Sequence, residues 1–190
     1  MNYISLNFEI KLYDNGRFEG KLKNGKKEGI GKFYYNNGDI YEGEFKNDKK
    51  EGKGIYYYND GDRYEGEFKN GKSEGKGIYY YNDGERYEGD FKNNKKEGKG
   101  IYYFNKEPWK GDRYEGDYKN DKPEGKGIYY YNNGNRYEGD WKNGNQEGKG
   151  IYYYNNGDRE MGNYLNDKRT GKHVTLHANL EVTSEIFFKE

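Results

Sequence analysis

A phosphate-binding loop is the first chemistry that the residue spacing suggests. The stretch Gly66–Ser73 matches the pattern G-x-x-x-x-G-K-S in full. Such a loop needs a buried strand before it and a helix after it, so that backbone amides converge on the phosphates. Here the first glycine lies inside an alternating, strand-like segment, and a second such segment follows. The sequence therefore predicts an ordinary turn at this point, with no nucleotide site and no cofactor.

Nucleophilic catalysis finds little support either. Serine occurs only at positions 5, 73 and 184, and the chain has no cysteine, so no nucleophile–base pair is evident. Glu65 and Glu74 have counterparts in nearly every repeat of the sequence. Repetition of that kind indicates a structural ladder, because a catalytic carboxylate pair would be needed only once. We expect no catalytic residues and no enzyme.

The two histidines do not form a metal site. His173 and His177 are four residues apart, which on a strand places them about 13 Å from one another, too far to share a metal ion. We interpret both as surface or cap residues. The sequence predicts no metal site.

Composition narrows the class of protein further. The 190 residues carry 34 basic and 34 acidic side chains, so no overall charge favours nucleic acid. Mean hydropathy is −1.56, yet 25 Tyr, 9 Phe and 2 Trp supply large apolar areas. The N-terminus does not resemble a signal peptide, and no apolar run approaches the ~20 residues that span a bilayer. We expect a folded cytoplasmic protein that is not secreted and does not bind nucleic acid.

An internal repeat organises the chain. The segment Tyr64–Arg86 reads YEGEFKNGKSEGKGIYYYNDGER, and similar 23-residue segments recur over residues 18–159, with an insertion near 106–110. A fixed period of this length predicts a stacked array, in which each repeat completes its burial against its neighbours. Residues 1–17 then form an N-terminal capping strand. Residues 160–190 form a degenerate repeat and a C-terminal cap.

Each repeat has the pattern of a β-hairpin. Tyr64, Gly66 and Phe68 alternate with polar residues, Asn70-Gly71 is a turn signal, and a β-rich segment returns from Gly75. By alternation, Gly75, Gly77, Tyr79 and Tyr81 share the face of the first strand's rings, so that rings lie over glycines. Glu65, Glu67, Lys76, Ile78 and Tyr80 occupy the other face. The predicted fold is all-β: an elongated, single-layer antiparallel hairpin array of about seven units with capping ends.

The aromatic face is the candidate binding surface. Its rings either form a core over the glycine-rich backbone or leave a groove open to an apolar partner segment, and the sequence does not separate these two interpretations. Trp109, on the insertion, is either part of a tolerated loop or a contact specific to a partner. The predicted partner-binding residues are Tyr41, Phe45, Tyr64, Phe68, Tyr87, Phe91, Tyr114, Tyr118, Tyr137, Trp141 and Trp109.

The repeat resembles the MORN repeat (membrane occupation and recognition nexus). The resemblance rests on YEGEFKNGKxxGKGxYxYxxGxxYEG at a 23-residue period, covers about Phe18–Arg159 fully and is weak over 160–182. It implies a hairpin array that acts as a scaffold at cytoskeletal, ciliary or membrane-associated structures, where some members hold a partner segment in the groove. The insertion around Pro108-Trp109 departs from the pattern.

Two functions remain open from the sequence. The favoured one is a non-catalytic scaffold whose aromatic groove binds a protein partner, for which a helical segment is a fitting candidate because two helical turns approach the repeat spacing. The alternative is a peripheral module that binds anionic phospholipid weakly, which a basic cluster would favour. Open sheet ends also permit self-association.

Overall fold

The computed structural model describes residues 8–179 and 182–188, and the chain divides into two units, residues 1–94 and 95–190. Every regular element in the described residues is a β-strand, and each strand pairs antiparallel with the strand that follows it within its unit. This confirms the predicted all-β hairpin array. The ends of the predicted caps, residues 1–7, 180–181 and 189–190, lie outside the described residues.

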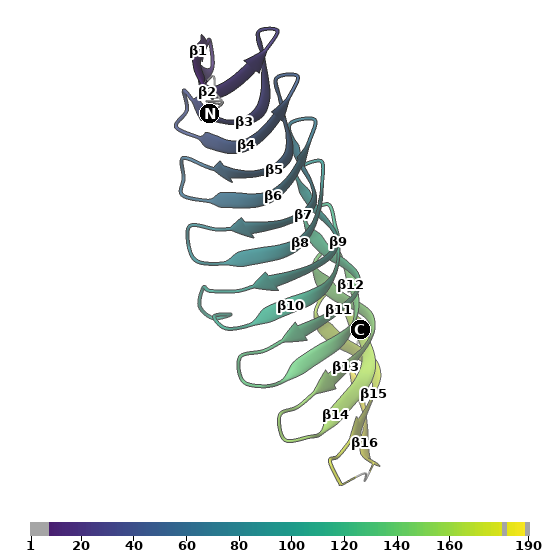
Figure 1. Cartoon of the computed structure of the whole chain (residues 1–190). Helices are drawn as coiled ribbons and strands as arrows, with labels where there is room; N and C mark the ends of the chain where they lie inside the picture. Colours follow the sequence, from purple (N-terminus) through teal and green to yellow (C-terminus); the bar gives the residue numbers. More distant parts are fainter. Residues whose placement is uncertain (1–7, 180–181, 189–190) are drawn as a thin grey trace, which may run out of the picture. The chain divides into compact units, whose positions relative to one another are not determined.

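The first unit contains eight strands that pair in sequence order, and Figure 1 shows its hairpins side by side in one layer. Its strands are β1 (Glu9–Tyr13), β2 (Gly16–Lys23), β3 (Lys26–Tyr35), β4 (Ile40–Lys46), β5 (Lys49–Tyr57), β6 (Arg63–Lys69), β7 (Lys72–Tyr80) and β8 (Arg86–Lys92).

The second unit repeats the arrangement with eight more strands. They are β9 (Lys95–Tyr103), β10 (Arg113–Lys119), β11 (Lys122–Tyr130), β12 (Arg136–Lys142), β13 (Asn145–Tyr153), β14 (Arg159–Leu165), β15 (Lys168–Leu176) and β16 (Val182–Phe188). The weak last repeat still forms a hairpin, because β14 and β15 pair from Arg159↔Leu176 onward.

Two-residue turns close the hairpins, as the sequence predicts. At Asn70-Gly71 both residues have positive φ, 52° and 86°. Two successive positive φ values define the type I′ turn, whose twist matches that of the flanking strands. Asn47-Asp48 adopts the same conformation at 48° and 69°. Asparagine and aspartate tolerate this region better than other side chains, which explains why every such turn begins with asparagine.

The register also confirms the predicted faces. Tyr64 pairs with Tyr79 and Gly66 pairs with Gly77 across β6 and β7. We call the side that carries these residues and Phe68 the aromatic face. The opposite side, with Glu65 opposite Ile78, is the charged face.

One detail of the predicted glycine pattern is wrong. Only the second glycine of each Glu-Gly-x-Gly motif lies beneath a ring. The first, Gly75, lies in a bulge at φ 72°, where a Cβ would contact the Glu67 carboxylate instead. The positive φ explains why this position requires glycine.

Candidate functional site

The rings of the first strands form a buried row over the glycines, which we call the inner row. A Cβ added at Gly77 would lie 2.5 Å from the Tyr64 hydroxyl oxygen and 2.6 Å from its ring carbon Cε2, so the ring rests directly on the backbone. The Tyr64 hydroxyl donates a hydrogen bond to the carbonyl oxygen of Glu67 at 3.0 Å. Burial raises the pKa of Tyr64. The ring is therefore a neutral, fixed part of the core.

Neighbouring repeats interlock through this row. The Tyr64 ring meets Phe68 of its own repeat at 5.1 Å and Phe91 of the next repeat at 4.8 Å, both edge to face. In the second unit Tyr114 meets Trp141 at 4.8 Å in the same manner. Such pairs stabilise by roughly 0.5–1.5 kcal/mol beyond the area they bury.

Ten of the eleven predicted binding residues belong to the inner row, and their side chains are only 0–7% exposed. A partner role for these ten stays a prediction, and their burial leaves little ring surface for a partner to contact. The ten are Tyr41, Phe45, Tyr64, Phe68, Tyr87, Phe91, Tyr114, Tyr118, Tyr137 and Trp141. The eleventh, Trp109, is 53% exposed on the loop between β9 and β10.

A second set of rings on the aromatic face remains half-buried, and we call it the outer row. Its rings form a continuous tilted series within each unit, with centroids 4.6–5.7 Å apart. All come from the second strands and the residue after each. They are Tyr35, Tyr56, Tyr58, Tyr79 and Tyr81 in the first unit, and Tyr102, Phe104, Tyr129, Tyr131, Tyr152 and Tyr154 in the second.

Carboxylates from the preceding loops hold part of the outer row. Asp62 accepts a hydrogen bond from the Tyr79 hydroxyl at 2.8 Å and another from the backbone N–H of Asn82 at 2.9 Å. Asp112 holds Tyr129 and Asn132 in the same way in the second unit. Each carboxylate therefore holds a ring and the next loop together.

A lysine that was not among the predicted site residues lies among these rings. Lys50, the second residue of β5, places its ammonium 4.2 Å from the Tyr56 ring centroid and 5.4 Å from that of Phe68. Burial lowers the pKa of Lys50 to about 8, against the raising effect of Asp39. The alternation of the sequence contains the signal, since Lys50 has the same parity as Gly54 and Tyr56, which belong to the aromatic face.

In the second unit, Pro123 takes the equivalent position and leaves a hollow. The short proline does not extend over the rings as Lys50 does, and a cavity of about 250 Å³ opens there. Trp141 and Tyr129 are stacked beside it, with centroids 6.3 Å apart, and the Trp141 indole N–H donates to the Gly127 carbonyl oxygen at 3.2 Å. The lining includes Lys96, Tyr102, Phe104, Tyr114, Tyr118, Asp121, Pro123, Tyr129, Trp141 and Gly144. We call this cavity the niche; its size suits one or two side chains better than a metabolite.

The charged face carries larger, more open hollows above the glycines, of about 570 Å³ in the first unit and 900 Å³ in the second. Their floors are backbone, because the glycines have no side chain. Their walls hold isoleucines and opposite charges, and Lys76 and Lys126 approach Asp90 and Asp140 as ion pairs. This face therefore presents alternating charge.

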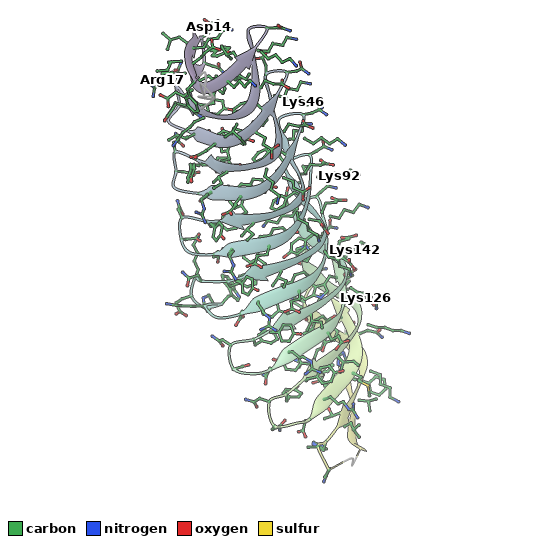
Figure 2. The ribbon with its side chains drawn as sticks, in the orientation of Figure 1. Asp14, Arg17, Lys46, Lys92, Lys126 and Lys142 are labelled. Atoms are coloured by element: carbon green, nitrogen blue, oxygen red, sulfur yellow. The ribbon has the colours of Figure 1, made fainter. Side chains whose placement is uncertain are left out.

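Exposed lysines flank the hairpin turns and face each other across them. Figure 2 shows Lys46 and Lys92 projecting from this edge of the first unit. The paired positions are Lys23↔Lys26, Lys46↔Lys49, Lys69↔Lys72 and Lys119↔Lys122. Like charges directly opposite are unfavourable, so these pairs are not explained by cross-strand stability, and they concentrate positive charge beside the turns. Glutamates at the same turns reduce the positive charge of this edge. Glu51, for example, is held at the turn because it accepts a hydrogen bond from the Asn70 backbone N–H at 2.9 Å.

The remaining chemical candidates have structural surroundings. Ser73 is buried, and its backbone N–H donates to Asn94 Oδ1 at 2.8 Å. His173, which the sequence suggested as a surface or cap residue, is 1% exposed and takes the place of a tyrosine over Gly162. It packs there because its ring meets Tyr164 and Phe188 edge to face at 5.3 and 5.0 Å.

Among the side chains that the structure describes, those of residues 8–179 and 187–188, no group of three or more His, Cys, Asp or Glu is arranged to hold a metal ion. The same part of the chain contains no helix with the length and apolar character that crossing a membrane requires.

Comparisons with known proteins agree with this architecture. The family model of the MORN repeat matches residues 18–40, 41–63, 64–86, 87–106, 114–136 and 137–159. A search of curated proteins finds no sequence that matches the chain.

Among solved structures, the chain is similar to the TCP domain of Drosophila melanogaster SAS-4 (dCPAP), solved with a proline-rich motif of Ana2 (dSTIL). The TM-score is 0.53 and the identity 15%, over 98% of this chain and 94% of that one. It is equally similar to the G-box domain of the microcephaly protein CPAP, with TM-score 0.53 and 15% identity over 96% of this chain and 100% of that one. At this identity the likeness shows the fold alone.

Proposed function

The chain belongs to the MORN repeat family, and on that basis we propose that it is a non-catalytic scaffold that binds a segment of another protein along the outer row. The observation that carries this proposal is the half-buried series of rings on one face of each unit. Tyrosine and tryptophan are favoured binding anchors because they offer large contact areas at low entropic cost. The outer row thus replaces the buried inner row as the contact surface.

The spacing of the rings favours an extended segment in the polyproline II conformation. Equivalent rings of adjacent repeats are two strands, about 9.6 Å, apart. Three residues of polyproline II advance about 9.3 Å, whereas two turns of an α-helix advance about 10.8 Å. A polyproline II segment therefore stays in phase over several repeats, and a helix drifts by more than 1 Å at each. The proline-rich motif bound by the SAS-4 TCP domain is consistent with this choice.

The niche in the second unit provides the expected anchor point. Its stacked Tyr129 and Trp141 form a wall for an apolar side chain or a proline ring, and Lys96 and Asp121 add polar groups to the lining. Aromatic-lined grooves are the usual recognition surface for polyproline II segments, since that conformation costs little entropy on binding.

Fluorescence of Trp141 offers a direct assay. In a Trp109→Phe background the only tryptophan is Trp141, beside the niche. The probes are a panel of synthetic proline-rich peptides and a panel of helical peptides of equal length. We expect saturable binding of proline-rich members, and truncation of a central anchor weakens such binding about thirtyfold.

Phe104→Ala and Ile128→Ala form the matched pair for this test. Phe104 lines the niche, whereas Ile128 lies in β11 next to Tyr129 but on the charged face. Provided that both variants melt like the parent, Phe104→Ala should lose affinity and Ile128→Ala should keep it. The reverse result would move the binding surface to the charged face, and saturable binding of helical peptides alone would exclude the polyproline II segment.

The lysine edge favours a second candidate function, weak association with anionic phospholipid. Paired lysines flank successive turns of the first unit, and each basic side chain near an anionic surface contributes about 1 kcal/mol of attraction. Sedimentation with phosphatidylcholine vesicles, with and without phosphatidylserine, tests this candidate. Binding should require phosphatidylserine, fall with added salt and disappear in a variant with Lys46, Lys49, Lys69 and Lys72 changed to glutamine. Sedimentation that is insensitive to salt would contradict it.

A further inference from the structure

The first strand of the first unit, β1, and the residue before it expose apolar side chains to an unusual degree. Phe8, Ile10 and Leu12 are 65%, 67% and 76% exposed. They alternate with Glu9 and Lys11, so the three share one face. Lys11 pairs with Phe18 of the inner row and therefore lies on the aromatic face. The three apolar side chains alternate with it, so they lie on the charged face. Exposed apolar strips of this kind usually mark an interaction site.

As far as the described residues go, the same strand has an open edge. Among the described residues, β1 pairs only with β2, through Glu9↔Gly20 to Tyr13↔Gly16. Its other edge presents backbone N–H and C=O groups along an exposed strand. Such an edge is a template for a further strand unless charge, proline or a covering segment blocks it.

The sequence of this edge is complementary to itself. When two antiparallel copies of residues 8–12 are centred on Ile10, Glu9 of one copy lies opposite Lys11 of the other, and Phe8 lies opposite Leu12. Ile10 meets its own copy on the two-fold axis. Both ion pairs then lie on one face and all six apolar side chains on the other, as favourable cross-strand pairing requires.

Other registers lack this match. Centring the pair on Glu9 or on Lys11 places that charge opposite its own copy, which is destabilising. A shift by one residue places apolar side chains opposite charged ones and moves one copy's apolar set to the wrong face. Glu9 also has no ion-pair partner among the described residues, so it is available to the second copy.

We propose that two copies of this chain associate through β1, antiparallel and centred on Ile10, into a two-fold dimer whose two sheets continue across the axis. The Lys11 ammonium, which donates to the Gly25 carbonyl oxygen at 2.7 Å within one copy, gains Glu9 of the other copy as a counter-charge. A two-fold pairing uses both edges and closes, so the assembly stops at the dimer. The surface is separate from the outer row, and the proposal does not depend on peptide binding.

A charge swap on the full chain tests the register. Sedimentation equilibrium over a concentration series gives the dimer dissociation constant for the parent and for Glu9→Lys, Lys11→Glu and the double variant. Each single change converts two attractive pairs into two repulsive ones, which should weaken dimerisation about tenfold or more. The double variant restores opposite charges and should recover the parent's constant to within about threefold.

Ile10→Lys supplies an independent variant, because it places two ammonium groups on the two-fold axis and should abolish the dimer. Circular dichroism melts establish that each variant is folded. A parent that stays monomeric at all concentrations would overturn the proposal and would fit an edge covered by the chain's own residues. A double variant as weak as the single variants would overturn the register, and masses that keep rising beyond the dimer would indicate head-to-tail pairing instead.

Discussion

Replacing Gly77 by alanine tests the central packing feature of the repeat, the ring that rests on glycine. The new Cβ would lie 2.5–2.7 Å from the hydroxyl oxygen and two ring carbons of Tyr64, where ordinary contacts are 3.4–4 Å. Gly77 does not have positive φ, so the expected cost comes from this overlap and not from the backbone conformation. Gly71 provides the matched control, because its Cβ would meet nothing within 4 Å, although its φ is 86°.

The magnitudes follow from what each substitution disturbs. To accept the Cβ, the Tyr64 ring must shift by about 1 Å, and overpacking of this kind costs typically 1–3 kcal/mol. The shift also strains the hydrogen bond from the Tyr64 hydroxyl to Glu67, which contributes about 1 kcal/mol. Gly77→Ala should therefore reduce the free energy of unfolding by about 3 kcal/mol, and Gly71→Ala by about 1 kcal/mol through backbone strain.

Urea unfolding of the full chain measures both variants. Because repeat arrays can unfold in parts, amide hydrogen exchange in β6 and β7 should accompany the denaturation curves. In a Tyr64→Leu background the Gly77→Ala cost should shrink, since the clashing hydroxyl and ring are gone. A Gly77→Ala variant no less stable than Gly71→Ala would refute the packing argument, as would an undiminished cost in the Tyr64→Leu background.

Substitutions at three further positions have expected outcomes. Lys50→Met should stabilise the first unit at neutral pH by about 1–2 kcal/mol, because burial penalises the ammonium by about 3 kcal/mol and the rings return part of this. The folded-state pKa of Lys50, about 8, lies below its unfolded value of 10.5, so the parent gains stability as pH rises between these values. Thermal melts should therefore show the stability difference between the parent and Lys50→Met narrowing over this pH range. Asp62→Ala should cost about 2 kcal/mol in urea unfolding by leaving Tyr79 and Asn82 without their acceptor, whereas Asp62→Asn should cost less, since Asn135 bonds Tyr152 and Asn155 at the equivalent position. Glu160 is buried, which alone would raise its pKa, but the Tyr154 hydroxyl and Arg169 hold the pKa below its usual range. The stability that ionised Glu160 contributes is therefore fully present above about pH 4.3, its unfolded pKa, and is lost as pH falls through the folded pKa. In Glu160→Gln the stability of the second unit should depend less on pH in this acid range.

The hairpins, turns and faces could be predicted from the sequence because they depend on neighbours along the chain. Alternation at Tyr64, Gly66 and Phe68 assigns these side chains to one face, and Asn70-Gly71 specifies the turn that reverses the strand. Repetition then predicts that each hairpin pairs with the next, since a lone hairpin buries too little to be stable. These features agree with the structure in both units.

Alternation assigns a side chain to a face of the sheet but does not say how far that side chain is buried. Tyr64 and Tyr79 share the aromatic face and pair directly, yet one is buried on glycine and the other is half-exposed. The difference arises because the Tyr64 ring crosses Gly66 and Gly77, two residues from different strands, and neighbouring repeats then cover it. For that reason the predicted binding residues fell largely on the inner row.

The sequence by itself therefore determined the repeat, the strands, the turns and the two faces, all of which are local and periodic. Only the tertiary structure decided which rings are covered, that Lys50 lies among them, that Asp62 links a ring to the next loop, and that Pro123 leaves the niche open. Each of these depends on atoms from neighbouring strands or repeats meeting in space. A periodic pattern specifies which side a residue faces, whereas contact and exposure depend on what packs against it.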